Sequence, residues 1–167
     1  MSTDNHRKGL YLAAGAALVF SPAAVFVRLA ASLNVWEITC LRLIIAGMTM
    51  AVAALWTKTP LLPPKEERKQ LALFAFITAF HFLTFTAALE RTSIAHSLAL
   101  TYTAPVFAAL IARFFIKEEL VGRQWLGILL VVFSVGWMCF GFSTSDAAML
   151  GDGLALLSGL SLGIYHV

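Results

Sequence analysis

The sequence predicts an all-α protein that crosses a membrane several times, and three observations carry this prediction. Hydrophobic residues make up 60% of the 167 residues and charged residues only 13%, against roughly 25% charged in a soluble domain. The mean hydropathy is +0.85. Charges also leave long uncharged runs, at Gly9–Val27, Leu43–Thr57, Gln70–Leu89, Thr92–Ala112 and Gln124–Ser145. Because a bilayer core needs about 20 apolar residues of helix, these runs predict five transmembrane helices.

The first three transmembrane helices are expected at Leu10–Leu29, Trp36–Trp56 and Leu71–Leu89. Pro22 predicts a bend in the first, because proline leaves the carbonyl of Leu18 without its helical donor. The second includes Arg42, and the tryptophans at its ends have the spacing of interfacial anchors, about 30 Å on a helix. Three prolines within 58–69 predict a loop before the third.

The fourth and fifth transmembrane helices are expected at Ile94–Phe115 and Trp125–Phe142. Pro105 predicts a kink near the middle of the fourth, because the carbonyl of Thr101 loses its helical donor. A sixth helix is expected from about Gly151 and is interpreted as incomplete.

These spans predict a cytoplasmic tail (1–9), a five-helix transmembrane repeat (10–145), and an outer loop with the start of a truncated second repeat (146–167). Cytoplasmic loops carry an excess of Lys and Arg. With the N-terminus inside, nine basic residues lie on the cytoplasmic side and three, Arg28, Arg42 and Arg91, lie toward the outside. The sequence therefore predicts a multi-pass protein of the inner (plasma) membrane with a cytoplasmic N-terminus.

The odd number of spans has a topological consequence. Five spans from an inside N-terminus end outside, so the sixth helix runs opposite to the first. Many secondary transporters consist of two repeats inverted in this way. Gly9–Leu18 and Gly153–Leu162 match at five of ten positions, which fits either an internal repeat or chance similarity between apolar segments. The expected partner is a second repeat, or another copy of the chain in a homodimer.

Small and weakly polar residues recur every four positions along the fourth span, at Ser93, Ser97, Thr101, Pro105 and Ala109. This spacing places them on one helix face. Two interpretations stay open, namely close helix packing through small side chains and a helix that lines a substrate cavity. In the sixth segment, Gly159 and Gly163 form a GxxxG pattern that indicates helix packing.

Polar side chains inside the other spans are candidates for function. His81 and Thr84 share one face of the third span, and an ionisable group at that depth usually faces the bundle interior or a wet cavity. His81 is interpreted as a neutral histidine bonded to a neighbouring helix, or as a substrate contact or proton carrier. Arg42 either extends to the outer surface or binds a carboxylate or phosphate in a cavity. Glu37 and Glu90 are candidate partners for Arg42 or for Arg28 at the end of the first span.

Other functions lack their sequence signals. No HExxH, GxSxG or P-loop pattern occurs, so neither an enzyme nor a cofactor is predicted. His81 has no metal-ligating residue within helical reach, and His96 is expected at the membrane interface, so no metal site is predicted. The net charge of +3 comes from short loops and not from a basic patch with aromatics, so nucleic acid is not an expected partner.

Two segments resemble the EamA-like branch of the drug/metabolite transporter superfamily: Ala88–Ser97 (ALERTSIAHS) and Thr103–Leu110 (TAPVFAAL). Glu118, Gln124 and Gly127 match that family's E-x5-Q-x2-G pattern, and Arg42 falls where the family commonly carries an arginine. The resemblance implies ten helices in two inverted five-helix repeats, of which this chain holds the first repeat and part of the sixth helix. It also implies export or exchange of a small organic metabolite by alternating access.

The expected substrate cavity lies between the first four spans and their inverted counterparts. The residues expected to line it are His81, Thr84, Thr101, Tyr102 and Pro105. Arg42 is expected to orient an anionic group or to hold an outer gate. Two alternatives stay open: a non-transporting assembly or regulatory subunit that packs through its small-residue faces, and a nonfunctional truncated fragment.

Overall fold

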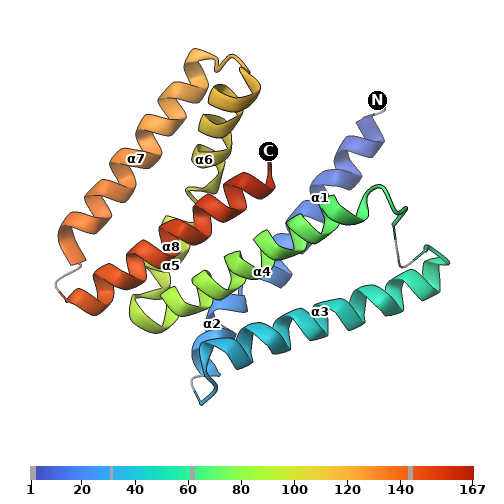
Figure 1. Cartoon of the computed structure of the whole chain (residues 1–167). Helices are drawn as coiled ribbons and strands as arrows, with labels where there is room; N and C mark the ends of the chain where they lie inside the picture. Colours follow the sequence, from blue (N-terminus) through green and yellow to red (C-terminus); the bar gives the residue numbers. More distant parts are fainter. Residues whose placement is uncertain (1–2, 31, 61–62, 143–144) are drawn as a thin grey trace.

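The computed structural model describes residues 3–30, 32–60, 63–142 and 145–167. All regular elements in this part of the chain are helices, joined by short connections (Figure 1). In chain order they are α1 (Thr3–Phe20), α2 (Ala23–Leu29), α3 (Val35–Thr57), α4 (Arg68–Arg91), α5 (Ile94–Thr101), α6 (Ala104–Ile111), the π-helical turn η1 (Ala112–Ile116), α7 (Gly122–Phe142) and α8 (Asp146–Tyr165). The predicted all-α fold is confirmed.

Within the described ranges, five stretches are long and apolar enough to cross a membrane: Gly9–Leu29, Val35–Thr57, Arg68–Arg91, Ile94–Ile116 and Asp146–Tyr165. The predicted fifth span lies within α7, where Gly122–Met138 forms a shorter apolar segment among the described residues. These helices confirm the prediction of a polytopic helical membrane protein.

The sixth helix is longer than the sequence predicted. α8 begins at Asp146, not near Gly151, because the Ser145 side chain caps it by accepting a hydrogen bond from the backbone N–H of Ala148 at 3.3 Å. The helix therefore has 20 residues, enough to cross a bilayer.

Both proline positions interrupt their helices as predicted. Ser21 and Pro22 separate α1 from α2, and Tyr102 and Thr103 separate α5 from α6. Pro105 lies in the first turn of α6. Backbone N–H groups in a first turn have no acceptor within the helix, so the N–H that proline lacks costs α6 no hydrogen bond. The first and fourth spans are thus discontinuous helices.

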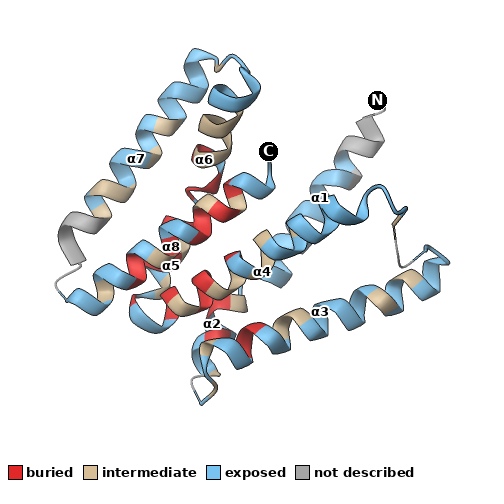
Figure 2. Ribbon diagram, viewed as in Figure 1, coloured by how far each residue is buried: buried red, intermediate tan, exposed pale blue. Residues whose placement is uncertain are grey.

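α8 is the central packing element of the bundle. It lies along α4 on one side and along α5 and α6 on the other, while α2 and α3 pack on α4 (Figure 1). Buried residues follow α8 and the parts of α4 and α5 that face it (Figure 2). One core cluster joins Ala88, Leu100 and Ala155 of α4, α5 and α8.

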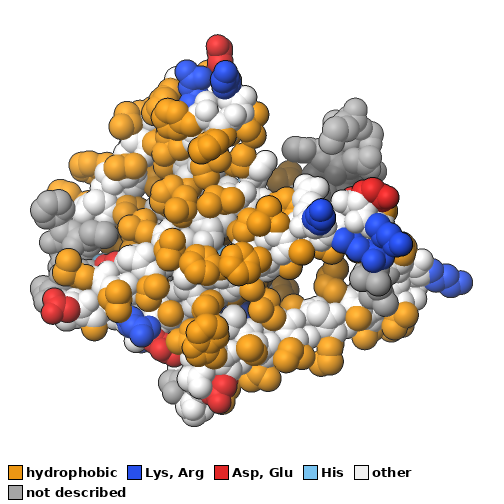
Figure 3. Space-filling view, in the orientation of Figure 1, with side chains coloured by type: hydrophobic (Ala, Val, Ile, Leu, Met, Phe, Trp, Pro, Cys, Tyr) orange, Lys and Arg blue, Asp and Glu red, His pale blue; other side chains and the backbone are white. Residues whose placement is uncertain are grey.

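The outer helices α1, α3 and α7 expose most of their apolar side chains (Figure 2). Figure 3 shows hydrophobic side chains over much of one face, with charged side chains gathered near its edges. In a soluble protein such a surface would be unusually large, whereas lipid covers it in a membrane.

Candidate functional site

A cavity of about 460 Å³ lies among α1, α3, α4, α5 and α8. Four of the six predicted substrate-cavity residues line it: Arg42, His81, Thr101 and Tyr102. The other lining residues are mostly apolar: Phe20, Ile77, Thr78, Phe82, Phe85, Leu98, Ser161, Leu162 and Tyr165. The cavity therefore presents a few polar groups in an apolar wall, the usual composition of a site for a small organic molecule.

Arg42 reaches this cavity from α3. A capping box starts that helix: Asn34 Oδ1 accepts from the Glu37 N–H at 3.0 Å, and Glu37 Oε2 accepts from the Asn34 N–H at 2.8 Å. The Arg42 guanidinium carbon lies 4.6 Å from the centroid of the Phe82 ring, a cation–π contact. Its Nη1 is buried and has no hydrogen-bond partner among the described residues.

The predicted carboxylate partners of Arg42 are engaged elsewhere. Glu37 belongs to the capping box, and Glu90 Oε2 lies 3.9 Å from Arg91 Nη1 at the end of α4. None of the described side chains that line the cavity is acidic. Arg42 therefore brings a positive charge to the cavity that no lining residue neutralises.

His81 links α4 to α8. Its Nδ1 lies 3.0 Å from the Ser158 carbonyl oxygen and 2.9 Å from Ser158 Oγ, and that hydroxyl donates to the His81 carbonyl at 3.2 Å. Since a carbonyl oxygen can only accept, Nδ1 carries the hydrogen in this contact. The imidazole also stacks on Phe85, with 6.2 Å between ring centroids. The expected bond to a neighbouring helix is thus present, on a residue that also lines the cavity.

Thr101 and Tyr102 lie at the break between α5 and α6. Thr101 Oγ1 donates to the Ala155 carbonyl of α8 at 3.3 Å and is buried. Tyr102 is 63% exposed, so its ring forms an open edge of the cavity.

Thr84 and Pro105 do not line this cavity. The Thr84 hydroxyl turns back to its own helix and donates to the carbonyls of Phe80 at 2.9 Å and His81 at 3.1 Å. Pro105 is exposed whereas Thr101 is buried, and the break at Tyr102 and Thr103 lies between them.

The same break divides the predicted small-residue stripe. Ser93 is exposed and caps α5 by accepting from the His96 N–H at 3.1 Å. Ser97 is fully buried, and its hydroxyl has no partner among the described residues. Ala109 is half-buried on α6.

Gly159 and Gly163 let α8 approach α5 and α6 closely. A Cβ atom at Gly159 would lie 2.9 Å from the carbonyl oxygens of Leu100 and Thr101. A Cβ atom at Gly163 would lie 2.7 Å from Phe107 Cβ. Contacts this short are accessible only to glycine, and they place α8 against the carbonyl of Thr101 that Pro105 leaves without a helical donor.

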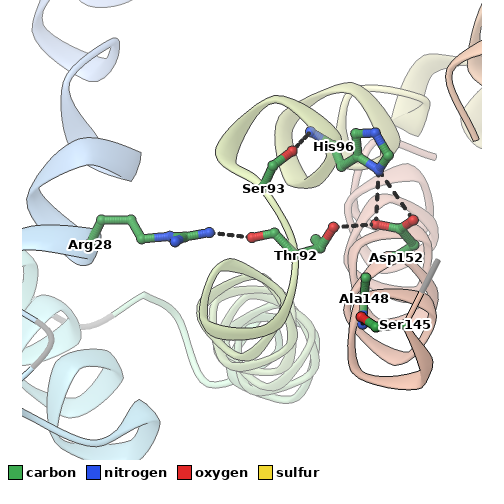
Figure 4. A network of polar contacts seen from close by, with 7 residues as sticks. All are labelled: Arg28, Thr92, Ser93, His96, Ser145, Ala148 and Asp152. Atoms are coloured by element: carbon green, nitrogen blue, oxygen red, sulfur yellow. Dashed lines mark hydrogen bonds and ion pairs between the residues drawn. The ribbon is translucent and has the colours of Figure 1, made fainter. Parts of the chain in front are cut away.

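Sequence reasoning missed a second polar cluster, shown in Figure 4. Thr92 Oγ1 donates to Asp152 Oδ1 at 2.7 Å, and His96 Nδ1 lies 3.2 Å from Asp152 Oδ2. The Arg28 guanidinium donates to the Thr92 carbonyl. His96 lies in the first turn of α5, the end of the span at which the sequence predicted it, and it is 6% exposed because other helices cover it. The available signal was the acid at position 152, which falls in the segment predicted as an outer loop and the start of a helix (146–167), but its spacing along the sequence indicates no partner.

The fold and the cavity define a class of protein: a multi-pass membrane protein in which two discontinuous helices contribute to a cavity lined by an arginine and a histidine. The chain matches the EamA-like transporter family over residues 7–140 and belongs to that family. This confirms the resemblance found in the sequence.

Two relatives are similar to this chain. An uncharacterized transporter, YdfC, of Bacillus subtilis (strain 168) is 29% identical over 127 residues, covering 75% of this chain and 41% of that protein. Solute carrier family 35 member G1 of Mus musculus is 26% identical over 111 residues, covering 66% of this chain and 30% of that protein. The chain thus corresponds to less than half the length of either relative. No solved structure matches it significantly.

Proposed function

We propose that this chain is one repeat of a secondary transporter that moves a small organic metabolite with an anionic group across the cytoplasmic membrane. The observation that carries the proposal is Arg42, whose buried Nη1 lacks a hydrogen-bond partner among the described residues and lies beside an apolar cavity. A buried charge is unfavourable unless it is paired, and guanidinium binds carboxylate and phosphate through two parallel hydrogen bonds. An anionic substrate supplies that pairing.

The arrangement of helices supports transport through the same cavity. Transporter substrate sites commonly form at discontinuous helices near the middle of the membrane, where interrupted backbone is tolerated because it lines a cavity. Here both interrupted spans contribute lining residues, Phe20 from α1 and Leu98, Thr101 and Tyr102 from around the α5–α6 break.

Alternating access requires a second structural half. We infer that a second, inverted repeat or a homodimer partner completes the cavity, and that rocking of one half against the other exposes Arg42 to each side in turn. The direction we propose is export or exchange, in a plasma membrane with the N-terminus in the cytoplasm.

The substrate class is tested by thermal unfolding of the full-length protein in detergent with small carboxylates, phosphate monoesters and their neutral amides or alcohols. A ligand at 100 times its dissociation constant stabilises the folded state by about 2.7 kcal/mol, which is readily measured as a rise in Tm. We expect one or more anions to raise Tm, and Arg42→Gln to abolish the rise. Arg42→Lys keeps the positive charge but cannot form two parallel hydrogen bonds to one anion, so this variant should retain part of the rise in Tm.

Arg113→Gln is the matched control, because Arg113 is an exposed arginine in η1 that does not line the cavity. Equal stabilisation by the neutral compounds, or an undiminished Tm rise in Arg42→Gln, would contradict the anionic substrate. The stabilising anion is then loaded into proteoliposomes. Binding without passage across the membrane would favour a non-transporting subunit.

A further inference from the structure

We propose that His96 and Asp152 form a proton-binding site that couples proton movement to the opening of one end of the bundle. The site lies where α2 and α4 end and where α5 and α8 begin (Figure 4). The inference rests on the proposed function, because a proton site of this kind gives a secondary transporter its driving ion. It is separate from the cavity at Arg42.

The pair has the chemistry of a proton site. Asp152 is 8% exposed, within a helix long enough to span a membrane, where ionisable residues are rare and mark proton pathways. Its carboxylate accepts from Thr92 Oγ1 at 2.7 Å and faces His96 Nδ1 through both oxygens, at 3.3 and 3.2 Å. Imidazole is the side chain that most readily changes charge between about pH 5 and 8.

Among the charged groups described around this site, His96 and Asp152 form the pair whose protonation state changes in this proposal. Arg28 of α2 donates to the Thr92 carbonyl, and Glu90 and Arg91 of α4 lie 3.9 Å from each other in exposed positions. Asp146 on α8 is exposed, and the one charged side chain described on α7, Arg123, lies at that helix's other end. With a neutral imidazole the pair carries one negative charge, and with an imidazolium it carries none.

This charge difference acts on helix contacts. The side chains of Thr92 and His96 tie the α4–α5 connection to α8 through Asp152, and the Thr92 carbonyl ties it to α2. Next to them, a Cβ atom at Gly151 would lie 2.9 Å from Thr92 N, so this end is closely packed. Opening it separates Asp152 from its partners. An imidazolium holds a carboxylate more strongly than a neutral imidazole does, so protonation favours the closed end and proton release favours the open one.

Protons and water have a route to the pair. His96, Thr92 and Ala148 line a second cavity of about 570 Å³, together with Arg28, Glu90, Arg91, Ser93, Ala95 and Met138. Ala148 is half-buried on α8, so a cysteine at this position reports on whether the cavity opens.

The test is the labelling of Ala148→Cys by a membrane-impermeant maleimide in the full-length protein, in a background with Cys40→Ala and Cys139→Ala. Each rate is divided by the rate for the same thiol in SDS at the same pH, which removes the intrinsic pH dependence of the thiolate. We expect the normalised rate to rise several-fold from about pH 5 to about pH 8, the range in which histidines titrate. His96→Gln and Asp152→Asn should both remove this dependence.

Three control variants separate a proton site from a structural bridge. Asp146→Asn and His166→Gln change exposed titratable groups and should leave the pH dependence intact. Thr92→Val removes one hydrogen bond but no titratable group, so it should raise labelling by a similar factor at every pH. If Asp152→Asn does not assemble, as judged by size-exclusion chromatography, His96→Gln alone carries the test.

A pH-independent rate in the parent protein, or a pH dependence that persists in His96→Gln, would overturn the proton site. The assay contains no substrate, so this result leaves the Arg42 binding test untouched. Conversely, pH-dependent labelling in a protein that binds no anion would contradict the proposed substrate and leave the proton site standing.

Discussion

Replacing Gly159 with alanine should separate α8 from the break between α5 and α6. The added Cβ atom would lie 2.9 Å from the carbonyl oxygens of Leu100 and Thr101 and 3.2 Å from Thr103 Oγ1. The first two neighbours are backbone atoms, which have no alternative rotamer. The clash is therefore relieved only by a movement of one helix relative to the other.

The size of the effect follows from that movement. Ordinary contact begins near 3.4 Å, so the required shift is about 0.5 Å (3.4 minus 2.9 Å). A gap of about 0.5–1 Å loses a quarter to a half of the dispersion attraction between facing atoms. The same shift lengthens the 3.3 Å bond from Thr101 Oγ1 to the Ala155 carbonyl beyond hydrogen-bonding range. We expect Gly159→Ala to lower the free energy of unfolding by about 1–3 kcal/mol, the usual range for overpacking.

The measurement is SDS-induced unfolding of the full-length protein in mixed micelles. Gly153→Ala is a matched control on the same helix, because a Cβ atom at Gly153 would lie more than 4 Å from the surrounding atoms of the described residues. This control should be neutral or slightly stabilising, because alanine is more favourable than glycine inside a helix by roughly 0.5–1 kcal/mol. If the two variants unfold within about 0.5 kcal/mol of each other, a spread typical of surface substitutions, the close approach of α8 does not determine stability.

Three further outcomes are expected from unfolding measurements. Asn34→Ala removes the cap of α3 and should lower the free energy of unfolding by about 1 kcal/mol, whereas Asn34→Asp keeps a capping side chain and should lose little. An alanine variant as stable as the parent would show that the cap contributes nothing to the stability of this protein. Ser97→Ala removes a buried hydroxyl with no partner among the described residues and should be neutral or stabilising by up to about 1 kcal/mol. A clear loss of stability would instead show that this hydroxyl makes a hydrogen bond to a group outside the described residues. Ser158→Ala should cost about 1 kcal/mol and His81→Ala more, since the first leaves the Ser158 carbonyl for Nδ1, whereas the second removes both Nδ1 contacts with α8 and the stacking of the imidazole on Phe85. The reverse order would contradict the assigned bonding.

The sequence predicted well those features of the fold that depend on residues close together in the chain. Pro22 and Pro105 mark both helix interruptions, because the loss of one backbone N–H acts on residues within a single turn. α8 begins earlier than predicted, because Ser145 caps the helix before Asp146, and the uncharged run after Asp152 does not reveal that cap. Helix existence and approximate length followed from the uncharged runs alone.

The lining of the cavity was harder to predict, because helical spacing defines a face but not a rotamer. Thr84 shares a face with His81, yet its hydroxyl bonds to its own helix, as threonines in apolar helices often do. Pro105 follows a break that changes the rotation of the helix, so four-residue spacing no longer places it beside Thr101. His96 and Asp152 are 56 positions apart in the sequence, and no local sequence pattern predicts which helices pack against each other.

α8 offers a physical route between the two polar sites. It supplies Ser158 and Ala155, which bond to His81 and Thr101 at the cavity, and Asp152, which bonds to Thr92 and His96 at the end of the bundle. Asp152 and Ser158 are about 9 Å apart along the helix axis, and a helix this short moves nearly as a rigid body. Glycine contacts at positions 151 and 159 hold the same helix at distances that tolerate little sliding. A displacement of α8 that frees Asp152 therefore also strains the bonds at the cavity, which is the mechanical condition that proton-coupled transport requires.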